Sequence, residues 1–243
     1  MSIYIYKNYN YNSISRFKDY FGKKYEIIFD KSNNDYKTPF HNDLFMIKIM
    51  INCLEKSEYF IETGLYLGYT SYFVAKNFSN INCYSCENNQ VVFNIAKNNI
   101  GSIDNLKIEL YKSPDALYNL NKYYGDLIFD KNVVFWIDAH WHNNPLNNEI
   151  FYITKNFKKF TIFIDDFVIP YDKSFSNDGD SLTIECILPY IQYKDKLKIY
   201  MPSYDSKHID CNNCNNCSLP PVGYCIITTE NIETYGYLRE III

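Results

Sequence analysis

Short runs of apolar residues alternate along most of this 243-residue chain with longer segments in which apolar residues recur every three or four positions. The short runs predict β-strands, and the longer segments predict amphipathic helices. One run, Val-Val-Phe-Trp-Ile, is apolar throughout, as expected for a strand buried on both faces. The expected strands are 59–62, 82–86, 106–111, 133–137, 160–164, 196–201 and 224–229, and the expected helices are 41–56, 70–78, 88–99, 114–120, 146–157 and 181–190.

The repeated order of strand and then helix predicts an α/β domain built on a parallel, doubly wound sheet. We expect this domain to occupy residues 41–243, preceded by a polar N-terminal extension, residues 1–40, that is rich in Tyr and Asn. The extension is expected to hold a short helix at 13–21 and a strand at 25–29. An insertion at 203–221, rich in Asn and Cys, interrupts the domain near its end.

Composition and charge narrow the class of protein. With 47% hydrophobic and 21% charged residues, the chain is typical of a globular domain. The net charge of −4 and the lack of any Lys/Arg run longer than two argue against a nucleic-acid ligand. No apolar stretch is long enough for a transmembrane helix, and the first residues lack the pattern of a signal peptide. We therefore expect a cytoplasmic protein with no membrane partner, whose eight cysteines are thiols or metal ligands.

A glycine-containing turn joins the first strand of the sheet to the next helix. Its pattern is Glu62-x-Gly64-x-x-x-Gly68, at the edge of an open parallel sheet where ligands bind. The glycines allow a sharp turn and a close approach to a ligand, and Thr70 and Ser71 are expected to cap the helix. The pattern lacks the Gly-x-Gly-x-x-Gly of a dinucleotide site and the Gly-Lys-Ser/Thr of a phosphate loop. The alternative is a turn that only connects strand to helix.

A second acidic residue, Glu87, ends the next strand, 25 positions after Glu62. A carboxylate at this place can accept hydrogen bonds from both hydroxyls of a ribose. The alternative is that Glu87 caps the helix that follows. Together, the glycine turn and the two acids at successive strand ends predict a site for an adenosyl cofactor.

Three more carboxylates follow the fourth and fifth strands. Asp138 comes directly after the buried run, in Ile-Asp-Ala-His-Trp-His, and Asp165 and Asp166 follow the fifth strand in Ile-Asp-Asp-Phe. Both strand ends should lie at the same edge as Glu62. Crowded carboxylates repel one another unless a cation or protons neutralise them, and oxygen ligands in this number suit Mg²⁺. The alternative is that the acid pair caps a loop.

Such a metal could hold a substrate hydroxyl and lower its pKa, and a base would then take the proton. The candidates for that base are Asp138, His140 and His142. We favour His140 because an imidazole titrates near neutrality. The alternative is that both histidines are surface residues.

A compact group of cysteines lies in and after the insertion. The spacing His208-x2-Cys211-x2-Cys214-x2-Cys217-x7-Cys225 would allow thiolates to surround one Zn²⁺. Iron–sulfur sites use similar spacing, and disulfides or plain thiols remain open. Cys225 is also expected to lie in a strand, where it could be a core residue.

In these motifs the chain resembles the class I S-adenosylmethionine-dependent methyltransferases, whose order of motifs residues 59 to about 230 follow. The resemblance implies a Rossmann-like α/β fold: a doubly wound sheet, mostly parallel, with an antiparallel late strand. It also implies that Glu62 and Gly64 lie at the methionine end of the cofactor and Glu87 at its ribose. Ser113 lies where the family binds the adenine, although Lys112 stands in place of the family's acid. The cofactor-binding set implied is Glu62, Gly64, Gly68, Thr70, Ser71, Glu87 and Ser113.

The pair Ile-Asp-Ala-His and Ile-Asp-Asp-Phe, followed by Pro170, resembles the macrocin O-methyltransferase group, which modifies sugars. The resemblance implies that Asp138, Asp165 and Asp166 hold Mg²⁺. We therefore expect an enzyme that methylates a hydroxyl of a small acceptor such as a sugar or nucleotide sugar. Transfer to a protein, an amine or a capped RNA, a non-catalytic binding role and a homo-oligomer remain open.

Overall fold

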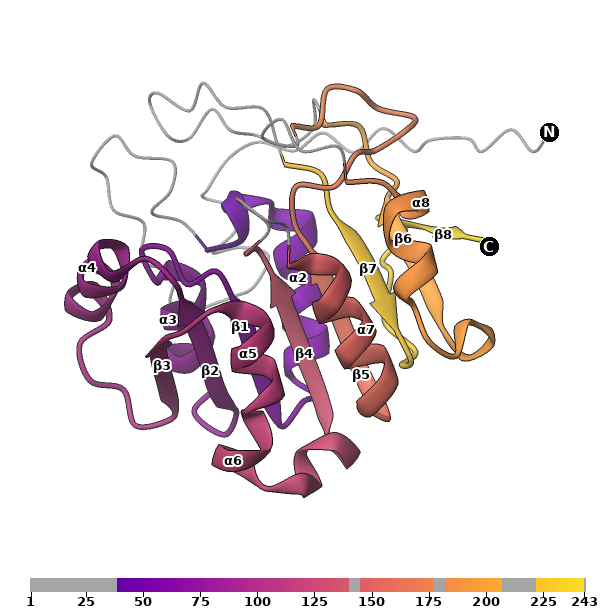
Figure 1. Ribbon diagram of the computed structural model, residues 1–243. Coiled ribbons are helices and arrows are strands. Elements are labelled where there is room, and N and C mark those ends of the chain that lie inside the picture. The colour runs from indigo at the N-terminus through magenta and orange to yellow at the C-terminus, as the bar shows by residue number, and fades with distance from the viewer. Residues whose placement is uncertain (1–38, 140–144, 177–181, 207–221, 243) are drawn as a thin grey trace, which may run out of the picture.

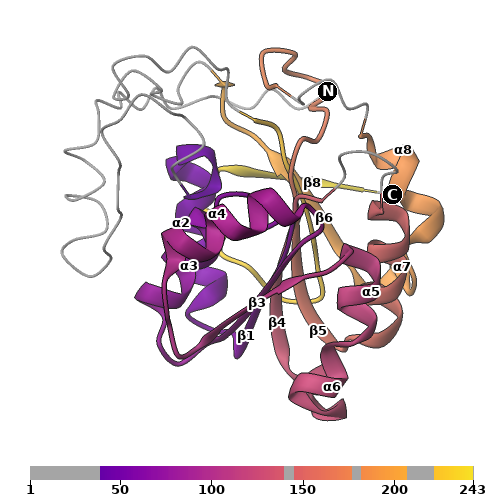
Figure 2. The same ribbon diagram turned by 60° about the vertical axis from the view of Figure 1, so that its left-hand side comes forward.

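The computed structural model describes residues 39–139, 145–176, 182–206 and 222–242, and the helix and strand expected at 13–21 and 25–29 lie outside these ranges. An eight-stranded sheet forms the middle layer of the protein, with helices on both faces (Figures 1 and 2). The strands are β1 (Tyr59–Thr63), β2 (Asn82–Glu87), β3 (Leu106–Leu110), β4 (Asn132–Ile137), β5 (Lys159–Ile164), β6 (Lys198–Pro202), β7 (Cys225–Thr228) and β8 (Leu238–Ile241).

The strand order is β3-β2-β1-β4-β5-β7-β6-β8. Strands β1 to β5 pair in parallel, whereas β7 runs antiparallel to both β5 and β6. This confirms the expected Rossmann-like sheet, mostly parallel with an antiparallel late strand. An additional edge strand, β8, pairs antiparallel with β6. The sequence did not predict it, because its residues Leu-Arg-Glu-Ile are half-buried or exposed and form no apolar run.

Helices α2 (Leu44–Leu54), α3 (Tyr69–Asn77) and α4 (Gln90–Ile100) cover one face of the sheet (Figure 2). The other face carries α5 (Ser113–Tyr118), α6 (Leu120–Tyr124), α7 (Leu146–Asn156) and α8 (Ile184–Ile187). Short 3₁₀ segments are η3 (Pro39–Asn42), η4 (Asp126–Asp130), η5 (Leu188–Tyr190) and η6 (Lys194–Lys196). The helix expected at 41–56 begins only at Leu44, because the Asp43 carboxylate accepts hydrogen bonds from the Phe45 and Met46 amides and caps it.

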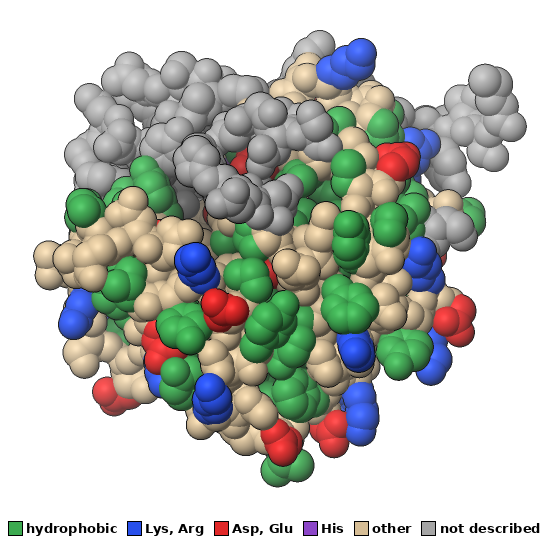
Figure 3. Space-filling view, in the orientation of Figure 1, with side chains coloured by type: hydrophobic (Ala, Val, Ile, Leu, Met, Phe, Trp, Pro, Cys, Tyr) green, Lys and Arg blue, Asp and Glu red, His purple; other side chains and the backbone are tan. Residues whose placement is uncertain are grey.

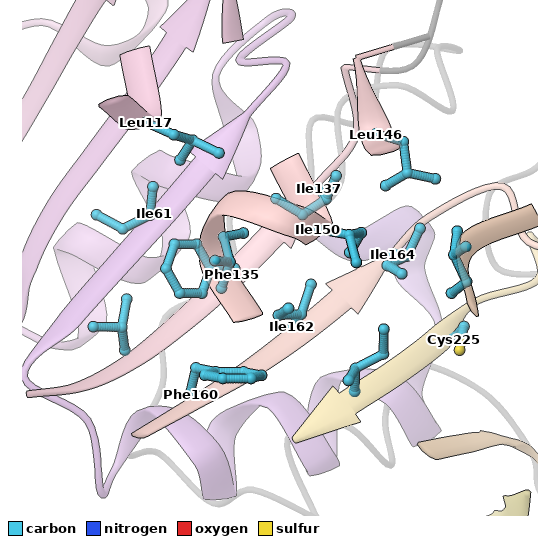
Figure 4. Packing of buried hydrophobic residues seen from close by; sticks show 14 of the residues in the cluster. Ile61, Leu117, Phe135, Ile137, Leu146, Ile150, Phe160, Ile162, Ile164 and Cys225 are labelled. Carbon is cyan, nitrogen blue, oxygen red and sulfur yellow. The ribbon is translucent and has the colours of Figure 1, made fainter. Parts of the chain in front are cut away.

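Alternating side chains of β4 pack on opposite faces of the sheet. Phe135 and Ile137 belong to the apolar cluster under α5 and α7, which Figure 4 shows with Leu117 and Ile150. Val134 and Trp136 belong to the cluster on the other face, under α2 and α3. Burying each such side chain contributes about 1.5–3 kcal/mol, so the continuous apolar run fixes β4 in the middle of the sheet.

The surface in the orientation of Figure 1 mixes charges of both signs with apolar side chains (Figure 3). Among all described residues, on whichever face they lie, the exposed apolar side chains include Tyr118, Leu127 and Phe151. The described part of this face therefore presents no basic patch of the kind that binds polynucleotides. No helix within the described ranges is long and apolar enough to cross a membrane.

Candidate functional site

The carboxyl ends of β1, β4 and β5 lie next to one another, and each is followed by a candidate site residue. In the parallel ladder Thr63 pairs with Ile137, which pairs in turn with Ile164. The Asp138 amide donates to the Thr63 carbonyl oxygen (2.9 Å), and the Asp165 amide donates to that of Ile137 (3.1 Å). The structure thus confirms that the acids after β4 and β5 emerge at the edge where the glycine turn leaves β1.

The glycine turn adopts backbone angles that favour glycine. Gly64 has a φ of 87° and Gly68 a φ of 85°. Helix α3 starts directly after Gly68, and no side chain caps it. The expectation that Thr70 and Ser71 cap this helix is therefore wrong. Both lie in its first turn, where their hydroxyls bond to other segments instead.

Glu62 lies in β1 and is almost fully buried, with 2% of its surface exposed. The hydroxyls of Ser71 and Ser85 both donate to its Oε2, at 2.5 and 2.6 Å. Burial raises the pKa of Glu62 to about 7, although these two hydrogen bonds act in the opposite direction. Near neutral pH this carboxyl can therefore gain or lose a proton in response to a nearby charge.

Glu87 ends β2, and its carboxylate accepts a hydrogen bond from the backbone of the glycine turn. Its Oε2 accepts a hydrogen bond from the Tyr66 amide (3.1 Å), and its Oε1 accepts one from the Asn89 amide (2.8 Å). Helix α4 is capped by Asn89 and not by Glu87, since the Asn89 side chain accepts from Val91 and Val92. Each carboxylate oxygen of Glu87 retains capacity for another donor.

A pocket with about 400 Å³ of empty space, part of it open solvent, lies between the turn, the Asp138 end of β4 and the η3 segment. Its lining residues are Phe40, His41, Glu62, Gly64, Leu65, Tyr66, Leu67, Gly68, Tyr69, Thr70 and Asp138. The pocket therefore brings together most of the cofactor-binding residues that the sequence predicted.

His41, which the sequence had not singled out, lies beside the acids. Its Nε2 is 2.6 Å from Oδ2 of Asp165, a residue that is 1% exposed. Burial alone would lower the pKa of His41, but the attraction of Asp165, with smaller effects of Asp138 and Asp166, raises it to about 10. One ligand atom each from His41, Asp138 and Asp165 lies within 4.8 Å of the others.

The η3 segment reaches the site through an unusual backbone. Phe40 and His41 have φ values of 52° and 51°, in the left-handed region. The Phe40 side chain is buried edge-on against Phe73 and Trp136, and its amide donates to the Thr70 hydroxyl (3.4 Å). The apolar anchor at Phe40 therefore offsets the backbone strain and places His41 beside Asp165, which is 124 positions away in the chain.

Asp166 and Ser113 are not among the residues of the cluster formed by His41, Asp138 and Asp165. Asp166 is buried with a φ of 52°, and it is not one of the three residues that share the 4.8 Å cluster. Ser113 starts α5, is buried, and donates its hydroxyl to the Glu149 carboxylate of α7. The predicted adenine contact of Ser113 would have to share that hydroxyl.

Several predicted site residues lie outside the described ranges: His140, His142, His208, Cys211, Cys214 and Cys217. Cys225 is described, and it is fully buried in β7 within the core cluster of Figure 4. Burial raises the pKa of its thiol above the usual range, which favours a neutral core residue over a thiolate ligand.

Comparison with known proteins finds no matching family model and no match among curated proteins. Solved structures do match. The O-methyltransferase TomG from Streptomyces achromogenes, involved in tomaymycin synthesis and solved with S-adenosylmethionine, is 11% identical with a TM-score of 0.51 over 77% of this chain and 79% of its own. The O-methyltransferase from Bacillus cereus, solved with S-adenosylhomocysteine, is 14% identical with a TM-score of 0.52 over 82% and 84%. At these identities the likeness shows a shared fold.

Proposed function

We propose that this chain is an S-adenosylmethionine-dependent methyltransferase that transfers the methyl group to a hydroxyl of a small acceptor. The observation that carries the proposal is the pocket at the carboxyl edge of β1 and β4, lined by Glu62, the glycine turn and Asp138, with Glu87 at its rim. Cofactors of doubly wound folds bind at this edge. The shared fold with two O-methyltransferases that were solved with this cofactor or its product agrees with the proposal.

In this proposal Glu62 and Gly64 face the methionine end of the cofactor. The buried carboxyl of Glu62 becomes ionised when the cofactor's ammonium group approaches, either directly or through water. Gly64 and Gly68 give the turn its left-handed backbone and let it pack against the Asp138 carbonyl and Ile100, which fixes this wall of the pocket. Glu87 accepts the ribose hydroxyls while it still holds the Tyr66 amide.

The acceptor hydroxyl would lie beside Asp138, the residue that lines both the cofactor pocket and the acidic cluster. The residues of this cluster fit a divalent cation: Oδ1 of Asp165 is buried and has no hydrogen-bond partner among the described residues, and carboxylates are ligands for Mg²⁺. We propose that Asp138 and Asp165 hold it, with Asp166, the next residue in the chain, as a further candidate ligand. When bound, such an ion lowers the pKa of the acceptor hydroxyl.

The chain's own groups supply positioning and proton transfer. Orienting the acceptor oxygen toward the methyl group provides much of the rate, since methyl transfer needs in-line geometry. We propose Asp138 or His140 as the group that accepts the hydroxyl proton. We also propose that residues 41–243 form the catalytic domain and that residues 1–40 are an extension whose last residue, Phe40, packs into that domain.

A sugar or nucleotide sugar is the acceptor class that we favour, on the resemblance of the two acidic motifs to the macrocin group. The test is a screen of methyl transfer from radiolabelled S-adenosylmethionine to nucleotide sugars, catechols, peptides and RNA. Transfer to a hydroxylated small molecule that falls in Asp138→Asn supports the proposal. Transfer to peptide or RNA alone would contradict it.

A further inference from the structure

The acidic cluster contains a nitrogen donor that comes from outside the strand ends. His41 belongs to η3, ahead of α2, whereas Asp138 and Asp165 follow β4 and β5. All three side chains offer a ligand atom within the same 4.8 Å. The donor set is therefore one imidazole and two carboxylates rather than carboxylates alone.

The spacing of these atoms fits a single ion after a small adjustment. Ligands about 2.1 Å from an octahedral ion lie roughly 3.0 Å apart when adjacent and 4.2 Å apart when opposite. The pair His41 Nε2 and Asp165 Oδ2, at 2.6 Å, would open by a few tenths of an ångström as the ion takes the place of the proton between them. The other separations do not exceed 4.8 Å, so they are at most a few tenths of an ångström wider than the spacing of opposite ligands.

Two further observations indicate a built site. Oδ1 of Asp165 is buried and lacks a hydrogen-bond partner among the described residues. His41 itself is fixed from both sides: Phe40 is buried against Trp136, and Asp43 caps α2 while accepting a hydrogen bond from the Tyr204 hydroxyl. A strained backbone at Phe40 and His41 held in this way is typical of functional positions.

We propose that His41 is a ligand of the divalent cation at this site, together with Asp138 and Asp165, and that the site consequently prefers Mn²⁺ to Mg²⁺. Mn²⁺ shares the preference of Mg²⁺ for carboxylates but, as a first-row transition-metal ion, it also accepts an imidazole nitrogen, whereas Mg²⁺ prefers a shell of oxygen atoms. Because His41 and Asp138 both line the cofactor pocket, the ion would lie at its wall with positions open to a substrate oxygen. The inference deepens the proposed function by naming the class of metal, but the binding itself needs neither cofactor nor acceptor.

The test is metal binding to the full-length protein without cofactor. The electron paramagnetic resonance signal of free Mn²⁺ gives the Kd of the protein for Mn²⁺, and competition with Mg²⁺ gives the Kd for Mg²⁺. Pulsed electron paramagnetic resonance of the bound Mn²⁺ shows directly whether a nitrogen is coordinated. Labelling the histidines with ¹⁵N identifies that nitrogen as imidazole. We expect a Kd for Mn²⁺ at least tenfold below that for Mg²⁺, with a coordinated imidazole nitrogen.

Variants of His41 distinguish a side chain that coordinates the metal from one that only balances the charge of Asp165. His41→Ala should abolish the nitrogen coupling and weaken Mn²⁺ binding by at least about tenfold, while Mg²⁺ binding changes less. His41→Asp should retain binding but shift the preference to Mg²⁺, because the site becomes all-oxygen. Glu58→Gln, at an exposed carboxylate just before β1 that pairs with Lys131, is the control and should keep both the coupling and the Mn²⁺ affinity.

Two results would overturn the inference: a nitrogen coupling that persists in His41→Ala, or Mn²⁺ binding that becomes tighter in that variant. Tighter binding would mean that His41 is only a counter-ion of Asp165. Titration of S-adenosylmethionine into the same samples distinguishes a failure of the His41 metal site from a failure of the proposed methyltransferase function. Cofactor binding without a coordinated nitrogen rejects the metal inference alone, and a coordinated nitrogen without cofactor binding rejects the proposed function alone.

Discussion

Gly64 faces the backbone carbonyl of Asp138 so closely that a Cβ atom on Gly64 would lie 2.3 Å from that oxygen. The contact joins the turn after β1 to the residue after β4, because Thr63 and Ile137 are paired in the ladder just before them. The predicted cofactor turn and the predicted acidic site are therefore held in one rigid unit. A change at either residue should affect the other.

Replacing Gly64 with Ala should destabilise the protein by more than the usual cost of a side chain at positive φ, which is about 1–3 kcal/mol. The reason is that the Cβ must also push away the Asp138 carbonyl. Urea unfolding measures the difference. Gly236→Ala is the matched control, since Gly236 has a φ of 76° and open space around its Cβ position. Equal losses in the two variants would contradict the role of the contact.

The carboxyl of Glu62 should make stability depend on pH. Its pKa is raised from 4.5 to about 7 in the folded state, so folding favours the protonated form. The stabilising contribution is full below pH 4.5 and is lost as the pH rises to about 7, by roughly 3 kcal/mol at about 1.4 kcal/mol per pKa unit.

Glu62→Gln removes this dependence because the amide does not titrate. Relative to the variant, the wild-type protein should therefore lose stability between pH 5 and pH 8, as measured by urea unfolding at both values. Glu58→Gln, at an exposed carboxylate that pairs with Lys131, should change stability by less than about 0.5 kcal/mol at either pH. Parallel pH profiles for wild type and Glu62→Gln would show that the Glu62 carboxyl is not perturbed.

Glu87→Gln should weaken binding of S-adenosylhomocysteine by about 10- to 100-fold, since hydrogen bonds to a charged acceptor are worth about 1.5–3 kcal/mol. The folded structure should persist, because Glu87 is only partly buried and its described hydrogen bonds go to the Tyr66 and Asn89 amides of the turn. Isothermal titration and thermal unfolding measure the two effects. Undiminished affinity in this variant would remove Glu87 from the ribose site.

Tyr204→Phe should cost about 1–3 kcal/mol, because it removes the hydroxyl that donates to the buried Asp43 carboxylate. Burial already raises the pKa of Asp43 to about 6, and loss of this donor should raise it further. Tyr224→Phe is a close control: its hydroxyl lies 3.1 Å from that of Tyr204 and does not contact Asp43 in any described hydrogen bond. Denaturant unfolding at pH 7.5 should rank Tyr204→Phe as the more damaging change, and the reverse order would be inconsistent with this network.

The sheet, and the edge of it at which Asp138 and Asp165 lie, could be predicted from the sequence because both depend on local patterns of apolar and acidic residues. The apolar run of β4 is buried on both faces, and parallel strands place Asp138 and Asp165 at one edge. Helix ends were less predictable. The helix expected at 181–190 shrinks to Ile184–Ile187 and a 3₁₀ turn, since isolated short helices depend on tertiary packing.

His41 could not be predicted from the sequence for a different reason. Its place beside Asp165 depends on two consecutive left-handed residues and on burial of Phe40 against Trp136, none of which leaves a periodic signal. In the sequence, only Pro39 and the helix-capping Asp43 indicate that the chain turns ahead of α2. They do not indicate which part of the protein this turn packs against.

Isothermal titration of S-adenosylmethionine and S-adenosylhomocysteine into the full-length protein shows whether the pocket at the edge of β1 binds an adenosyl cofactor. We expect one site per chain with a Kd below roughly 100 µM, weakened in Gly64→Ala and Glu87→Gln and unchanged in Glu58→Gln. NAD should give no heat, because the turn lacks the pyrophosphate-binding glycine pattern. Absence of binding for both adenosyl compounds at millimolar concentration would show that this pocket is not a cofactor site.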